Sequence, residues 1–175
     1  LKLGIDWYRD WVGIVVYPDE FIIPRSVEDE FGVVHEYDDV ASGEAWDGGP
    51  LLISWRDAQM AGEGYNVVIH EFAHKLDMQN GEADGVPPLP TGVARQEWEA
   101  TLLAAYDDFC ALLDEAEERG EETLLDPYAA ESPGEFFAVM SETFFEAPTI
   151  LREEYPAFYA LLARFYRQNP AAAPQ

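Results

Sequence analysis

The sequence is poor in basic residues. Only 10 of its 175 residues are Lys or Arg, against 35 Asp and Glu, and the formal net charge at pH 7 is −25. Proteins that bind nucleic acids or anionic membrane surfaces need cations to neutralise phosphate groups. We therefore expect neither a nucleic acid nor a membrane as a partner. Such an acidic surface favours solubility and is also typical of proteins adapted to high salt.

Cysteine and long apolar runs are also scarce or missing. The single cysteine, Cys110, cannot form an internal disulfide, which favours a reducing compartment. The sequence has no apolar run of transmembrane length and no signal-peptide pattern. We therefore expect a cytoplasmic protein. Its length and composition predict one globular domain over residues 1–175, and the start at Leu1 leads us to expect a missing N-terminal segment.

The spacing of apolar residues predicts an α+β fold. Four short runs rich in β-branched and aromatic residues predict strands at 13–17, 21–23, 33–37 and 51–55. Their short connections favour a small, mostly antiparallel sheet. Helical spacing follows at about 65–80, 94–119, 132–147 and 149–168. We expect the sheet to pack on the first of these helices, with the other helices C-terminal to it.

Histidine is scarce too, and two of the three histidines lie on this first helix. His70 and His74 are four residues apart, so that both rings project from one face at a spacing suited to one tetrahedral ion. Glu71 completes the pattern H-E-x-x-H, in which the glutamate is the general base. The alternative is two ordinary core histidines, but burying these groups in so apolar a helix is costly without a partner. The pattern predicts one Zn²⁺ per chain, with Asp77 on the same face placed to orient a ligating histidine.

A third protein ligand must come from elsewhere in the chain. The metzincin pattern requires a histidine six residues after His74, and that position is Asn80, so this pattern is excluded. A thermolysin-like spacing would use Glu97 or Glu99, which we expect to be solvated on an amphipathic helix. Asp84, in a Gly-rich loop, is a further option without support.

Glu135 is the candidate that we favour as the third ligand. It lies at the start of the most apolar helix in the chain, where a buried charge is costly unless it is paired or binds a metal. The alternative role for Glu135 is a capping box with Ser132, three residues earlier. Glu142 shares its helix face and is either another ligand or an acid that supports one.

Several stretches in combination match a known family: residues 70–78, 128–139 and 141–145, with 32–37, 42–46 and 49–50 upstream. The chain resembles the Mlc titration factor A family, which are bacterial zinc metallopeptidases with a catalytic core related to anthrax lethal factor protease. The resemblance implies a zincin-like domain of gluzincin type.

The resemblance also implies roles for individual residues. His70 and His74 would be zinc ligands, Glu71 the base and Glu135 the third ligand. Tyr128, seven residues before Glu135, would face the metal and support the oxyanion. The chain departs from the lethal factor core at Val139, where that core carries a second glutamate, and this departure leaves the role of Glu142 open.

Two functions follow from the resemblance. It implies aminopeptidase-like cleavage of small peptide substrates, and it implies binding of a transcriptional repressor of sugar uptake. In the second case the protein would sequester its partner, and the zinc site would be weakly active or structural. The intact Glu71 favours the enzyme, because a structural site needs no general base.

His35 is the third histidine. It could reach the cleft of the metal site from the sheet, but its position fits an ordinary strand residue better.

Overall fold

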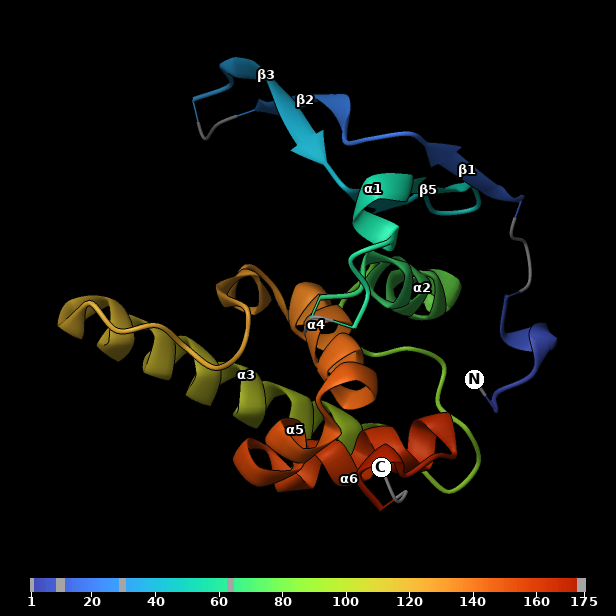
Figure 1. The fold of residues 1–175 in the computed structure, drawn as a ribbon, viewed down its shortest axis with the longest axis vertical. Helices are drawn as coiled ribbons and strands as arrows, with labels where there is room; N and C mark the ends of the chain where they lie inside the picture. Colours follow the sequence, from blue (N-terminus) through green and yellow to red (C-terminus); the bar gives the residue numbers. More distant parts are fainter. Residues whose placement is uncertain (1, 9–11, 29–30, 63–64, 173–175) are drawn as a thin grey trace.

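The structure is a computed structural model that describes residues 2–8, 12–28, 31–62 and 65–172. The strands of the N-terminal third lie to one side of a central helix, α2 (Val67–Asp77), and the C-terminal helices lie to its other side (Figure 1). The α+β class predicted from the sequence is confirmed.

A three-stranded mixed sheet covers α2. It contains β1 (Ile14–Tyr17), β5 (Leu51–Ser54) and β4 (Gly43–Ala45) in the order β1-β5-β4. β1 runs parallel to β5, and β4 runs antiparallel to it. The central strand β5 is buried over its whole length and packs on α2, whereas β4 forms one edge of the sheet.

The remaining two strands form a separate antiparallel hairpin that projects from the body of the molecule (Figure 1). They are β2 (Phe21–Glu28) and β3 (Val34–Ala41). Two expectations were therefore wrong: the strands do not form one sheet, and β2 does not end at Pro24. A proline is tolerated at a free strand edge, where its missing N–H breaks no ladder hydrogen bond, and both strands of a two-stranded ribbon have such an edge.

Short helical turns flank the central helix. α1 (Trp55–Ala58) follows β5 directly and is capped by the Ser54 hydroxyl, which accepts a hydrogen bond from the backbone N–H of Asp57. Asn66 caps α2 by accepting from the N–H of Ile69. The 3₁₀ turn η2 (Met78–Asn80) continues α2, so the predicted helix over residues 65–80 is confirmed within two residues at each end.

Lys75 connects α2 to the sheet. Its ammonium group donates to the carbonyl oxygens of Trp46 and Gly49, the second at 2.8 Å. Both carbonyls belong to the turn between β4 and β5, so this buried lysine fixes the turn against the central helix.

The C-terminal half consists of helices in the order α3 (Arg95–Arg119), η3 (Pro127–Ala130), α4 (Pro133–Glu146), α5 (Pro148–Glu154), α6 (Pro156–Tyr166) and η4 (Pro170–Ala172). α4 packs against α2 and is buried over most of its length. The single helix expected over residues 149–168 was wrong, because it is divided at Pro156. A proline lacks the backbone N–H and its ring disfavours the helical conformation of the preceding residue, so α5 ends and α6 begins there.

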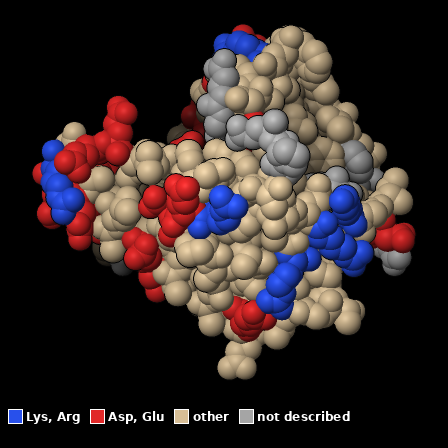
Figure 2. Space-filling view, turned by 60° about the horizontal axis from the view of Figure 1, so that its bottom comes forward, with Lys and Arg blue, Asp and Glu red and all other residues tan. Residues whose placement is uncertain are grey.

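The core and the surface differ sharply in character. The core below α2 is aromatic, with the fully buried side chains of Trp98, Phe136, Phe137, Phe158 and Phe165. Acidic side chains gather on the outside, notably over the end of α3 that projects to the left in both views (Figure 2). No helix among the described residues is long and apolar enough to cross a membrane.

Candidate metal centre

Three side chains from two helices converge at one point. Nε2 of His70 lies 3.1 Å from Nε2 of His74, and each of these nitrogens lies 3.1 Å from Oε2 of Glu135. The two histidines come from successive turns of α2, and Glu135 comes from the first turn of α4. Among the described residues these three form a group with a spacing that could hold a metal ion.

The donor set and its spacing fit zinc. Two imidazole nitrogens and a carboxylate oxygen are ligands that Zn²⁺ prefers, and bonds of about 2.0–2.1 Å in a tetrahedron separate the ligand atoms by roughly 3.4 Å. The three observed separations of 3.1 Å are close to this edge length. Three protein ligands would leave the fourth position of the tetrahedron open, as in catalytic sites.

Local capping places Glu135 at the site. Ser132 is the N-cap of α4, and its hydroxyl accepts a hydrogen bond from the N–H of Glu135 at 3.1 Å. In a full capping box the glutamate side chain would return to the backbone of the cap residue. Here its Oε2 instead faces His70 and His74, so the cap positions the residue while the carboxylate remains directed at the histidines.

Glu142 lies behind His70. Its Oε1 is 2.6 Å from Nδ1 of His70, and its Oε2 accepts a hydrogen bond from the backbone N–H of Asn66 at 2.7 Å. The side chain is buried, and it connects the ring of His70 to the cap of α2. A carboxylate in this position fixes the ring so that the other nitrogen faces the metal.

Asp77 is placed differently. It is fully buried at the end of α2, and its Oδ2 accepts a hydrogen bond from the N–H of Gly85 at 2.6 Å. Its Oδ1 and Nδ1 of His74 are both buried without a hydrogen-bond partner. The structure thus brings Asp77 to the loop that follows α2, and no hydrogen bond joins it to His74.

The proposed base and the tyrosine line a shared cavity of about 420 Å³, which is also lined by His70. Glu71 is buried there, and burial raises the pKa of its carboxyl to about 8, partly offset by the charge of His70. The ring of Tyr128 lies 6.0 Å from that of His70, centroid to centroid, and is 45% exposed. Burial and the nearby Glu135 raise the pKa of Tyr128, so it is a neutral phenol that can donate a hydrogen bond.

The charges at the site favour a bound cation. Burial alone would lower the pKa of His70, but Glu135 and Glu142 outweigh burial and raise the pKa to about 10. Burial would likewise raise the pKa of Glu135, but His70 and His74 hold it at about 2. The carboxylate of Glu135 therefore stays ionised and attracts positive charge to the ring nitrogens.

The other candidate ligands lie elsewhere. Glu97 pairs with Arg164 at 2.6 Å, and Glu99 pairs with a neighbouring arginine on α3. Asp84 accepts a hydrogen bond from the N–H of Val86 within its own loop. His35 is exposed on β3 and does not line the cavity.

Sequence reasoning missed several residues of the site. Arg25 and Asp39, both on the β2–β3 hairpin, line the cavity and are bonded to each other at 3.3 Å. Gly43 on β4 also lines it and lies against Glu71. None of these residues carries a motif, because the hairpin and the edge strand reach the site only through the tertiary fold.

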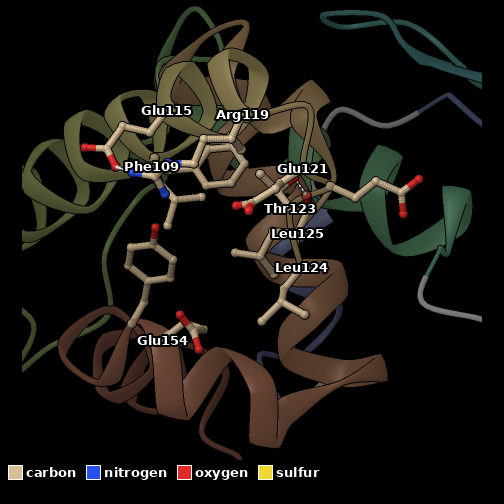
Figure 3. A pocket seen from close by; sticks show the side chains of 12 residues that line it. Phe109, Glu115, Arg119, Glu121, Thr123, Leu124, Leu125 and Glu154 are labelled. Atoms are coloured by element: carbon tan, nitrogen blue, oxygen red, sulfur yellow. Dashed lines mark hydrogen bonds and ion pairs between the residues drawn. The ribbon is translucent and has the colours of Figure 1, made fainter.

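A second cavity, of about 300 Å³, lies between α3 and α5 (Figure 3). Leucine side chains such as Leu124 and Leu125 form one wall, and the rim carries glutamates including Glu115, Glu121 and Glu154. None of the residues that line it is a histidine, so it has no part in the metal centre.

The site and the fold together define a class of protein. A helix that carries two histidines and a glutamate, a third carboxylate from a second helix and an adjoining cavity form the arrangement of a metallopeptidase. Comparison with known families gives the particular family: residues 1–167 match the family described as glucose-regulated metallo-peptidase M90. The chain belongs to this family.

Curated relatives agree with this assignment. Proteins named Mlc titration factor A are 44% identical in Edwardsiella ictaluri (strain 93-146) and 42% identical in Serratia proteamaculans (strain 568) and Yersinia pestis (strain Pestoides F). The matches cover 97%, 100% and 98% of this chain, and 65%, 67% and 64% of the respective relatives. The chain thus spans about two thirds of the length of these relatives, and the family resemblance predicted from the sequence is confirmed.

Proposed function

We propose that this chain is a zinc-dependent peptidase with its metal held by His70, His74 and Glu135. The observation that supports the proposal is the near-equilateral triangle of two imidazole nitrogens and one carboxylate oxygen beside the cavity. A zinc ion bound there would polarise the peptide carbonyl and lower the pKa of water.

The chain's own residues supply the proton transfers. In its ionised form, Glu71 accepts the proton of the attacking water and passes it to the amine that leaves. Tyr128 donates a hydrogen bond to the oxygen that becomes negative as the peptide carbon becomes tetrahedral. Glu142 keeps His70 in one orientation throughout, through its contact with Nδ1.

The cavity also suggests how a peptide binds. β4 is an edge strand, and Gly43 at its start lines the cavity, so an extended peptide can pair with its backbone. Asp126 adds negative charge to the cavity wall, whereas Asp39 is paired there with Arg25. The carboxylate of Asp126 favours a substrate with a free, positively charged amino terminus, in agreement with aminopeptidase-like cleavage.

Replacing the base tests the proposal. Glu71→Gln should retain one zinc per chain and lose at least about 100-fold in peptide cleavage, because proton transfer by a positioned side chain contributes about 10²–10⁴-fold. Zinc content by atomic emission and cleavage of aminoacyl nitroanilides are measured on the same samples. Full activity of Glu71→Gln would remove Glu71 from the mechanism.

A second candidate function comes from the relatives, which are named for titration of Mlc. The chain would then bind a repressor protein, and its zinc site would be weakly active or structural. Treatment with a chelator separates the two functions. Loss of cleavage with unchanged repressor binding supports two independent activities, whereas loss of binding alone supports a structural zinc.

A further inference from the structure

We propose that Gly43 is a positioning residue for Glu71. Because it has no side chain, the edge strand β4 contacts the glutamate directly and restricts where its carboxylate can lie. The inference rests on the proposed peptidase function, since it concerns the placement of the proposed base.

The space at position 43 is already filled by Glu71. A methyl group on Gly43 would lie 2.5 Å from Oε1 and 2.6 Å from Cγ of Glu71, and 2.7 Å from Cγ2 of Val67. Cβ atoms in proteins essentially never lie closer than 3.0 Å to atoms outside their own residue and its chain neighbours. Any residue other than glycine must therefore displace Glu71, Val67 or the strand.

Position 43 requires glycine because no space is left for a side chain, and not because of its backbone conformation. Gly43 lies in a strand and is not among the glycines with a positive φ, so other residues could adopt its backbone geometry. Glycine inside a strand weakens the strand, and it often marks a place where another group approaches the backbone closely. At position 43 the group that approaches is the side chain of Glu71.

A side chain at position 43 should affect the placement of Glu71 more than it affects the fold. The tip of a glutamate side chain moves more easily than a β-strand that is paired to its neighbour, and β4 is paired to β5 over its whole length. A side chain at position 43 should therefore push the carboxylate of Glu71 away from its place in the cavity. Misplacing a catalytic group by about 1 Å can cost about 100-fold in rate.

Gly49 offers a matched control. It also lacks a positive φ, and a methyl group there would lie 2.9 Å from Cβ of Trp46. Gly49→Ala thus introduces a milder steric conflict in the neighbouring turn, and none of the three nearest atoms belongs to Glu71.

The first experiment compares the wild type, Gly43→Ala and Gly49→Ala. Gly43→Ala should retain one zinc per chain and lose at least about tenfold in kcat, with KM changed less than about threefold, because a displaced base affects proton transfer more than substrate binding. Gly49→Ala should keep its kcat. A kcat of Gly43→Ala within twofold of the wild type would overturn the proposal. If the wild type cleaves no peptide, the proposed function fails, and the second experiment still tests the contact.

The second experiment needs no activity. Melting temperatures are measured in chelator for Gly43→Ala in the wild-type and Glu71→Ala backgrounds. The Glu71→Ala background lacks Oε1 and Cγ of Glu71, two of the three atoms closest to the added methyl group. Gly43→Ala should therefore lower Tm less than half as much in this background as in the wild type. An equal loss in both backgrounds contradicts the contact. If Gly43→Ala fails to fold, recovery of folding in Glu71→Ala supports the proposal and failure in both overturns it.

Discussion

At the scale of single residues, Glu142 orients one histidine of the candidate metal centre. One carboxylate oxygen contacts Nδ1 of His70, and the other accepts from the backbone that begins α2. The ring of His70 is thereby fixed with Nε2 towards Glu135. The sequence left Glu142 between two roles, and only the packing of α4 on α2 distinguishes them.

Removing this support should weaken metal binding. Glu142→Ala is expected to lower zinc affinity about 10–100-fold, as is usual when the group that orients a ligating histidine is lost. Glu146→Ala is the matched control, because Glu146 lies one turn along α4 and contacts the side chain of Asn66 and no histidine. Competition with a chromophoric chelator measures both variants. Equal zinc affinity of Glu142→Ala and the wild type would contradict this role.

At the scale of elements, Lys75 joins the central helix to the turn of the sheet. Its ammonium group satisfies two backbone carbonyls in a buried position. Desolvation lowers the pKa of this ammonium, and the nearby Asp47 opposes the shift. Lys75 thereby holds the turn that follows β4 against α2.

Lys75→Met tests the connection. The variant keeps most of the apolar stem but leaves two carbonyls without a donor, so we expect the free energy of unfolding to fall by about 2 kcal/mol or more. Arg95→Met, which removes an exposed pair with Glu99 at 2.6 Å, should cost less than about 0.5 kcal/mol. Urea denaturation measures both. A similar loss in the two variants would show that Lys75 is no more than a surface contact.

The elements also show what the sequence could and could not predict. α2, α3 and α4 were predictable because their apolar periodicity is long and α4 begins with the capping pattern Ser132-Pro133. β4 and α1, with 3 and 4 residues, are too short to show a period.

The residues of the candidate site likewise include some that the sequence could predict and some that it could not. The pair on α2 follows from a local spacing of four residues. Glu135 lies 61 residues beyond His74 in the sequence, and only the packing of α4 against α2 brings it to the histidines. Gly43 lies in a stretch that resembles the family, but nothing in the sequence indicated its role, because a missing side chain matters only once its neighbours are known.

For the whole molecule the dominant feature is its net charge of −25. Acidic side chains gather over the projecting end of α3 (Figure 2). Charge of one sign disfavours the compact state through self-repulsion, and the repulsion between exposed charges is screened by salt.

The folded state should therefore be more stable in salt. Raising NaCl from about 0.01 M to about 1 M shortens the Debye length from about 30 Å to about 3 Å, so we expect the melting temperature of the metal-free chain to rise by several degrees. Thermal melts followed by circular dichroism measure the shift. A melting temperature that stays constant or falls would mean that local ion pairs outweigh the net repulsion.

The most direct test of the account is the position of the metal in crystals of the zinc-loaded chain. Anomalous diffraction at the zinc edge should show one peak per chain, about 2.0–2.2 Å from Nε2 of His70, Nε2 of His74 and a carboxylate oxygen of Glu135. No peak at this position, or a zinc ion bound without Glu135, would contradict the central claim.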